Sequence, residues 1–164
     1  MNNTYPLLRN LLPSNLKMVW FLRTIITFGL SLFIAGIVWF ACFKFWNPHW
    51  LPLVGYIILF LIALEFIGAI LLIPYRYAFH RYEINSEELA FQKGFFFRQT
   101  VFVPIIRIQH VETQQGPLLR QQHLMSLVVY TAATEHRIAG LSVAEATKLR
   151  NQILHLVKVV REDV

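Results

Sequence analysis

Residues 24–43 read TIITFGLSLFIAGIVWFACF, and this stretch decides the fold. It contains twenty residues without a formal charge, and Arg23 and Lys44 stand directly before and after it. Because an α-helix rises about 1.5 Å per residue, a helix of this length covers about 30 Å, the thickness of the hydrocarbon core of a bilayer. The stretch therefore predicts a transmembrane helix.

A signal peptide is the main alternative for an apolar stretch so near the amino terminus. Its apolar region is about 7–15 residues long and ends at a small-residue cleavage site, whereas this stretch is longer and lacks such a site. Trp39-Phe40-Ala41 before Cys42 also matches a lipoprotein acylation site poorly. We interpret Cys42 as an ordinary membrane residue, and a single cysteine excludes an intrachain disulfide.

Residues 51–75 form a second apolar stretch, LPLVGYIILFLIALEFIGAILLIPY, which is long enough to cross the membrane with some tilt. The connector FWNPH is so short that the two helices must be antiparallel neighbours. Residues 76–164 hold eleven of the fifteen Lys and Arg and eight of the nine acidic residues, so charge is concentrated after the second span. We therefore divide the chain into an N-terminal segment (1–23), a transmembrane hairpin (24–75) and a water-soluble domain (76–164).

The orientation of the hairpin follows from the basic residues beside the spans. Those on the terminal side are Arg9, Lys17, Arg23, Arg76 and Arg81. The connector side has only Lys44. By the positive-inside rule, we expect a cell-membrane protein with two spans and with both termini in the cytoplasm.

Glu65 is the acidic residue inside the predicted spans. A charged side chain near the bilayer centre costs at least about 2.5–3.5 kcal/mol, so a proton relay or an ion ligand is the default interpretation. The alternative is a hydrogen-bonded Glu at a helix–helix contact, with Ser31 at similar depth as its expected partner in the chain. We favour this contact, because transport normally requires more converging polar groups; an ion or proton role in a larger complex stays open.

The soluble half has the pattern of several short strands followed by one helix. We predict strands over residues 75–84, 89–93, 95–103, 107–113, 127–131 and 136–139. Pro104 should end the third of these and Gly140 the last, and residues 118–124 are predicted to be a short turn or loop. This arrangement indicates a bent sheet or open barrel.

The last element is a predicted amphipathic helix with a clear start signal. Ser142 is placed to cap it, and Glu145 three residues later completes a capping box. Its apolar stripe consists of Ala146, Leu149, Ile153, Leu156, Val157 and Val160. The fold class is therefore α+β: a two-helix transmembrane hairpin, then a bent β-sheet or open barrel with one C-terminal amphipathic helix.

Two short runs carry a resemblance to a known family. RIQHVE at residues 107–112 and QGPLLR at residues 115–120 are similar to the signature of bacterial pleckstrin-homology-like (bPH2-type) membrane proteins, the YdbS-like family. The resemblance covers nearly the whole chain. It implies a PH-like fold and a binding or scaffolding role, often beside a larger relative with several PH-like domains. The chain departs from the family near residues 122–124 and at Ala133, where glycine is common, so we expect different turns there.

No pattern typical of catalysis or metal binding stands out. The six histidines are scattered without metal-ligand spacing, no serine lies in a nucleophile elbow, and no glycine-rich phosphate loop occurs. The loop Asn85-Ser86-Glu87-Glu88 is acidic where phosphoinositide recognition requires basic residues, and the dispersed basic residues do not favour nucleic acid. We therefore expect no enzyme activity, cofactor, metal, nucleic acid or specific phosphoinositide.

The predicted function is a noncatalytic, membrane-anchored PH-like module that acts as a binding or scaffolding subunit with other membrane proteins, in a setting such as envelope maintenance or stress resistance. The partner is expected in the bilayer, such as the larger relative; a homo-oligomer stays open. Candidate partner-binding residues are Arg107, Gln109, His110, Gln115 and Arg120, with structural polar groups as the alternative interpretation. The alternative function is an accessory subunit of a transporter or membrane enzyme that uses Glu65 to handle ions or protons.

Overall fold

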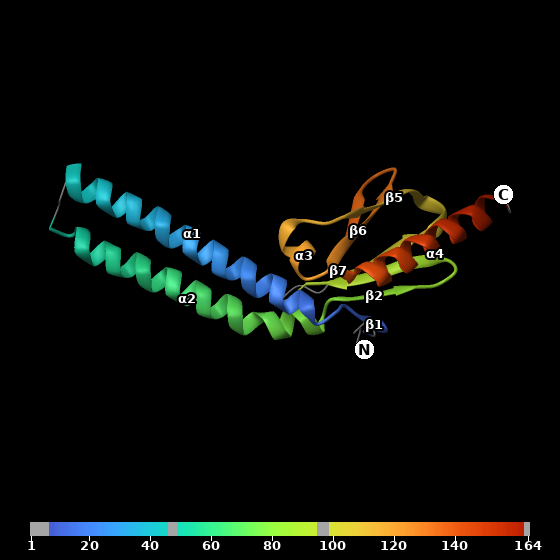
Figure 1. Ribbon diagram of the computed structural model, residues 1–164, viewed down its shortest axis with the longest axis horizontal. Coiled ribbons are helices and arrows are strands. Elements are labelled where there is room, and N and C mark those ends of the chain that lie inside the picture. Colours follow the sequence, from blue (N-terminus) through green and yellow to red (C-terminus); the bar gives the residue numbers. More distant parts are fainter. Residues whose placement is uncertain (1–6, 46–48, 95–98, 163–164) are drawn as a thin grey trace, which may run out of the picture. The chain divides into compact units, whose positions relative to one another are not determined.

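The computed structural model describes residues 7–45, 49–94 and 99–162, which form two compact units (Figure 1). The hairpin unit comprises Trp20–Ile73. The soluble unit joins the described part of Met1–Val19 to that of Pro74–Val164. The amino-terminal segment, predicted as a separate piece (1–23), is therefore mostly a component of the soluble unit.

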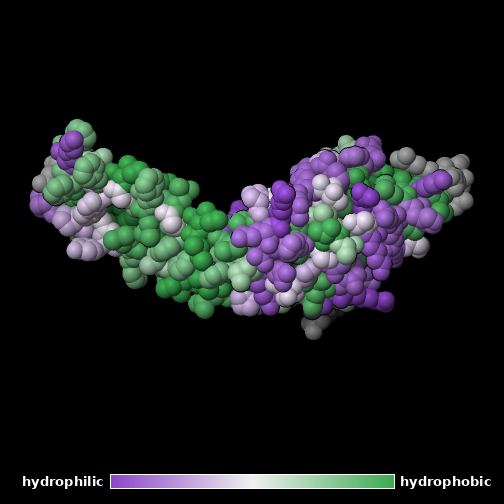
Figure 2. Space-filling model, viewed as in Figure 1, coloured by the Kyte–Doolittle hydropathy of each residue, from purple (hydrophilic) through white to green (hydrophobic). Residues whose placement is uncertain are grey.

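The hairpin unit consists of two antiparallel helices. Helix α1 spans Asn15–Phe45 and helix α2 spans Leu51–Ala78, so each exceeds its predicted span. Both are long and apolar enough to cross a membrane, and neither has its most apolar stretch buried by the rest of the described chain, unlike the core helix of a soluble protein. Figure 2 shows the corresponding hydrophobic surface along these helices.

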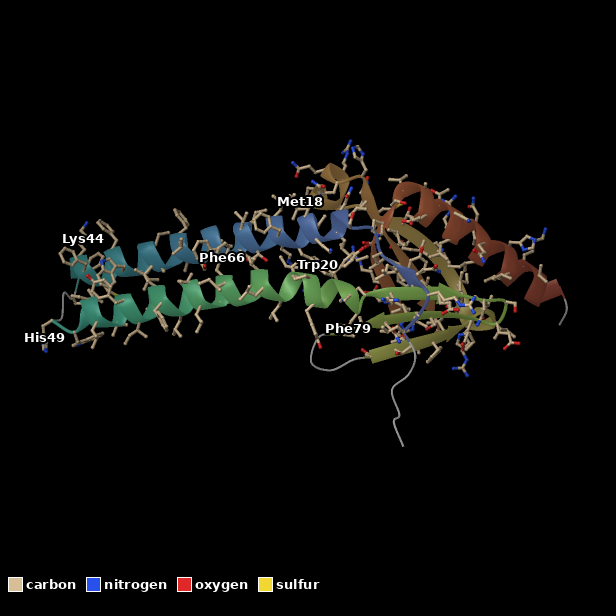
Figure 3. The ribbon with its side chains drawn as sticks, turned by 90° about the horizontal axis from the view of Figure 1, so that it is seen from below. Met18, Trp20, Lys44, His49, Phe66 and Phe79 are labelled. Carbon is tan, nitrogen blue, oxygen red and sulfur yellow. The ribbon has the colours of Figure 1, made fainter. Side chains whose placement is uncertain are left out.

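An aromatic pair and a tryptophan–glycine contact lie between the two helices of the hairpin. The ring of Phe66, which Figure 3 labels, stacks on that of Phe28 with centroids 4.2 Å apart. Nearer the connector, the Trp39 ring lies over Gly55, where an added Cβ would be only 1.7 Å from a ring carbon. Over most of their length, the Cα atoms of the two helices are more than 8 Å apart.

The first sheet of the soluble unit contains four described strands in the order β1-β2-β3-β4. Their bounds are Asn10–Leu11, Arg81–Ile84, Glu88–Lys93 and Gln99–Pro104. Leu89 pairs with Val103 and Phe91 with Val101, which puts one apolar face of the sheet into the core. The strand predicted over 95–103 is seen from Gln99, because residues 95–98 lie outside the described part of the chain.

The prediction of a strand from residue 75 was wrong at its start. Residues 75–78 continue α2, and the strand begins only at Arg81. Tyr75 and Tyr77 have strand propensity, but propensity is a weak preference that tertiary contacts override. Here the Tyr77 hydroxyl donates a hydrogen bond to the Leu12 carbonyl, and the Lys17 ammonium lies 4.3 Å from the centre of the Tyr77 ring.

The second sheet has the order β5-β6-β7 and is separate from the first, so the described strands do not close into a barrel. Strands β5, β6 and β7 span Ile108–Gln114, Leu124–Thr131 and Glu135–Ser142. A 3-10 turn, η1 (Ile105–Arg107), precedes β5, and the predicted loop at 118–124 contains a short helix, α3 (Pro117–Gln121). His123 after α3 has φ +53°, the left-handed region in which glycine is common.

Gly140 does not end the last strand, contrary to the prediction. Strand β7 continues to Ser142, and Gly140 forms a bulge between the pairs Met125–Leu141 and Ser126–Ala139. Its φ of +88° suits glycine, which provides this conformation without a steric penalty. The Leu16 side chain lies where a Cβ of residue 140 would stand, at 2.4 Å, so the bulge also seats the amino-terminal segment.

Helix α4 (Val143–Glu162) packs against η1 and all three strands of the second sheet. Its capping box is confirmed: the Glu145 amide donates to the Ser142 Oγ at 3.1 Å, and the Ser142 amide donates to the Glu145 carboxylate at 3.0 Å. Of the predicted stripe, Ala146, Leu149 and Ile153 are buried, whereas Leu156 and Val157 are half-buried. The side chain of Val160 lies outside the described set.

Candidate functional site

Glu65 lies near the middle of α2, and its side chain is exposed on the hairpin surface. It borders a cavity of about 100 Å³ between the two helices. The other lining residues are Thr24, Thr27, Phe28, Ser31, Ile62, Phe66 and Ala69. The structure therefore brings Glu65 and Ser31 to one cavity, together with two threonines that sequence reasoning did not single out.

The hydroxyl groups of this cavity donate within their own helix. Thr24 donates to the Trp20 carbonyl at 2.9 Å, Thr27 to the Thr24 carbonyl at 2.9 Å, and Ser31 to the Phe28 carbonyl at 2.8 Å. Ser31 therefore lines the same cavity as Glu65, but its hydroxyl donates its hydrogen bond to the Phe28 carbonyl and not to the Glu65 carboxyl. Among the residues that the structure describes, none donates a hydrogen bond to the Glu65 carboxyl.

A carboxyl group in this position is costly unless something compensates it. On insertion scales an acidic side chain at the bilayer centre costs at least about 2.5 kcal/mol, and an unpaired polar group in an apolar medium is unfavourable in any protonation state. The cavity is large enough for a small polar group, since one water needs only about 10–15 Å³ of comparable volume. The cavity therefore has room for a small polar group beside Glu65.

The predicted partner-binding residues of the soluble unit do not form one cluster. Arg107 ends η1, Gln109 and His110 lie at the start of β5, and Gln115 and Arg120 come after its end. Because a strand rises about 3.3 Å per residue, Gln109 and Gln115 are about 20 Å apart. All five side chains are exposed, but the Gln115 amide donates to the Leu124 carbonyl at 2.8 Å and so fixes the α3 segment to β6.

His110 instead joins a polar network on the second sheet that sequence reasoning missed. The Tyr130 hydroxyl donates to the Glu112 carboxylate at 3.0 Å, the Gln114 amide donates to the same oxygen, and the His110 Nε2 lies 3.8 Å from the other oxygen. Hydrogen bonds from Gln114 and Tyr130 hold the pKa of Glu112 below its usual range, and the bond to Glu112 raises the pKa of Tyr130. The alternation His110-x-Glu112-x-Gln114 was the available signal, because residues two apart share one face of a strand.

The β2–β3 loop is a compact acidic turn. The Asn85 side-chain oxygen accepts hydrogen bonds from the amides of Glu87 at 3.0 Å and Glu88 at 2.7 Å. Glu87 is exposed there, and the absence of specific phosphoinositide binding stays a prediction. Within the described ranges, no three His, Cys, Asp or Glu side chains are grouped as metal ligands.

Comparisons with known proteins agree with the resemblance carried by RIQHVE and QGPLLR. A family model described as the bacterial PH domain matches residues 22–157. The chain is 38% identical over 156 residues to the UPF0699 transmembrane protein YdbS of Bacillus subtilis (strain 168), which covers 93% of this chain and 94% of that protein. No solved structure matches the chain.

Proposed function

This chain belongs to the bacterial PH domain family, as a YdbS-like transmembrane member, and on that premise we propose that it is a noncatalytic, membrane-anchored module that assembles with another membrane protein. Neither the family's description nor the relative's name refers to a reaction. The proposed partner lies in the same membrane, for example a larger protein with several PH-like domains, and a second copy of the chain is the alternative.

The exposed Glu65 carboxyl is the observation that carries this proposal. A hairpin that served only as an anchor would favour apolar side chains on its outer surface, because these match the lipid tails. Glu65 interrupts that surface in mid-span and is left without a hydrogen-bond donor in the described chain. A helix–helix contact with a partner would give the carboxyl its missing hydrogen bonds and would select that partner.

The soluble unit offers a second contact surface in this proposal. Arg107, Gln109 and Arg120 are exposed, and no ion pair joins either arginine to another described residue. They remain candidate partner-binding residues, whereas Gln115 has a structural bond. We also propose that both termini are cytoplasmic, since the basic residues beside the spans lie mainly on the terminal side.

A second candidate function is an accessory role in a transporter or membrane enzyme. The cavity with its carboxyl and three hydroxyl groups favours it, because such oxygen atoms bind protons and small cations. The two functions differ in what they require of Glu65: an assembly contact needs the carboxyl for partner recovery, whereas an ion role needs it for turnover of an intact complex.

Glu65→Gln tests the proposed function. The tagged full chain is extracted in native nanodiscs, and the membrane proteins that co-purify are quantified by mass spectrometry. We expect a stoichiometric partner with the wild type and its loss with Glu65→Gln, while Leu64→Ala, a change at the neighbouring exposed position, keeps it.

Each other outcome has a definite meaning. An intact complex that loses transport or enzymatic activity with Glu65→Gln would favour the accessory role. A wild-type chain that is monomeric and free of partners in nanodiscs would contradict the assembly proposal.

A further inference from the structure

The Glu65 cavity has an unusual balance of hydrogen-bonding groups. Three hydroxyl groups line it, from Thr24, Thr27 and Ser31. Each donates its one hydrogen bond to a backbone carbonyl of α1. A hydroxyl has one donor and two acceptor sites, so what each of them can still offer is an acceptor. In its ionised form, the carboxylate of Glu65 is also an acceptor only.

The cavity is therefore a site for a donor that carries positive charge. Four side chains present oxygen lone pairs, and the one formal charge among them is negative. The hairpin unit contains two cationic side chains: Lys44, which is twenty-one residues from Glu65 in the sequence and close to the connector (Figure 3), and Arg23, which stands directly before Thr24. Among the described residues, neither forms an ion pair with Glu65, so the hairpin provides the acceptors but no cation paired with them.

The volume of the cavity favours one class of cation over another. The cavity measures about 100 Å³, several times the space that a single water needs. A bare metal ion would leave most of this volume empty, whereas an alkylammonium or guanidinium group would fill it with donors. The exposure of Glu65 on the hairpin surface leaves the cavity accessible from the side.

We propose that the Glu65 cavity binds a cationic nitrogen group, supplied by a Lys or Arg side chain of a partner membrane helix. This rests on the proposed function and specifies the chemistry of the partner. The three hydroxyl oxygens and the carboxylate accept the hydrogen bonds of the cation, and the opposite charges compensate each other inside the bilayer. A free monovalent cation has related chemistry and is separated from the side chain by the experiment below.

The experiment combines a carboxyl-reactive probe with removal of the hydroxyl groups. Dicyclohexylcarbodiimide, which reaches carboxyl groups within membranes, is added to the full chain in native nanodiscs, and Glu65 modification is followed by peptide mass spectrometry. With a partner lysine in the cavity, we expect an amide cross-link between Glu65 and that lysine. With a partner arginine, we expect Glu65 to be protected only while the complex is intact. With sodium instead, protection should rise with added Na⁺ and need no partner.

The hydroxyl groups are tested by Thr27→Val with Ser31→Ala, which keeps the shape and removes two acceptors. Hydrogen bonds to charged groups are strong enough that we expect about a tenfold loss of partner recovery for each hydroxyl removed. Tyr56→Phe is the matched control, because it removes an exposed hydroxyl of the same hairpin outside this cavity and should leave recovery unchanged.

The outcomes separate this inference from the function on which it rests. Unchanged partner recovery in the double variant, with Glu65 equally reactive in the complex and alone, would overturn the cation site and leave assembly intact. Protection by Na⁺ alone would assign the cavity to a free cation and overturn the side-chain source. If no partner is recovered and Na⁺ gives no protection, both proposals fail.

Discussion

The two units of the chain use their apolar residues in opposite ways. In the soluble unit, β6 is buried on both faces, with Leu127, Val128 and Val129 at most 1% exposed. Of the described hairpin residues, by contrast, Leu51 and Gly55 are the buried ones, and most large apolar side chains face outward. A substitution of an apolar residue in the soluble unit should therefore lower the stability of that unit. In the hairpin, it should instead weaken the contacts with a partner protein or with the surrounding lipid.

Several glycines illustrate this difference. Gly140 in the soluble unit has the Leu16 side chain where its Cβ would be, whereas Gly29, Gly36 and Gly68 in the hairpin face open space; Gly116, before α3 in the soluble unit, also faces open space. Gly55 under Trp39 is the place where the hairpin is packed like a core. A groove of about 730 Å³, lined by both helices, extends along this part of the hairpin. The hairpin thus has unfilled surface between its helices.

Gly140→Ala should have the largest effect. Alanine is strained at φ +88°, and its methyl group would collide with Leu16, so we expect a loss of about 3 kcal/mol in the free energy of unfolding of the soluble unit. Hydrogen exchange of the β6 amides in the full chain measures it. Gly29→Ala is the same chemical change in open space and should cause no loss, and adding Leu16→Ala to Gly140→Ala should recover part of the stability. Equal losses at positions 29 and 140 would contradict the contrast between the units.

Ser126→Ala should have a smaller effect of the opposite sign. The Ser126 hydroxyl is fully buried in β6 and has no hydrogen-bond partner within the part of the chain that the structure describes. Because an unpaired buried polar group is unfavourable, its removal should raise the free energy of unfolding by about 1 kcal/mol. The same hydrogen-exchange measurement detects it, with Ser86→Ala in the exposed β2–β3 loop as the neutral control. A marked loss of stability would show that the hydroxyl has a partner.

The smallest expected effect is a pH dependence at His80. Burial lowers the pKa of His80 below its ordinary value of 6.5, against an opposing hydrogen bond with the Arg76 carbonyl. The unfolded chain therefore takes up the proton first, so this contribution to stability is present above about pH 6.5 and is lost as the pH falls below it. Thermal unfolding between pH 7.5 and 5.5 should show the decline. His80→Gln should flatten it, and His155→Gln, at an exposed position of α4, should not.

Some residues of the candidate site could be recognised from the sequence, and others could not. Glu65 was recognisable because a charged residue within an apolar stretch violates the composition of a transmembrane helix. The roles of Thr24 and Thr27 were not, since they depend on which face of α1 meets α2 and on where each hydroxyl donates. The run from Arg107 to Arg120 looked like one patch, but an extended strand separates its two ends.

By itself, the sequence determined the two spans and the helix cap, because hydrocarbon thickness and a capping box act on consecutive residues. The RIQHVE and QGPLLR runs likewise indicated the family. Only the tertiary structure decided that the amino-terminal segment belongs to the soluble unit: β1 pairs with β2 about seventy residues away, and Leu16 fills the space at Gly140. It also decided that β7 continues through Gly140 and that residues 75–78 are helical. These features result from contacts between segments distant in the chain, which no local pattern encodes.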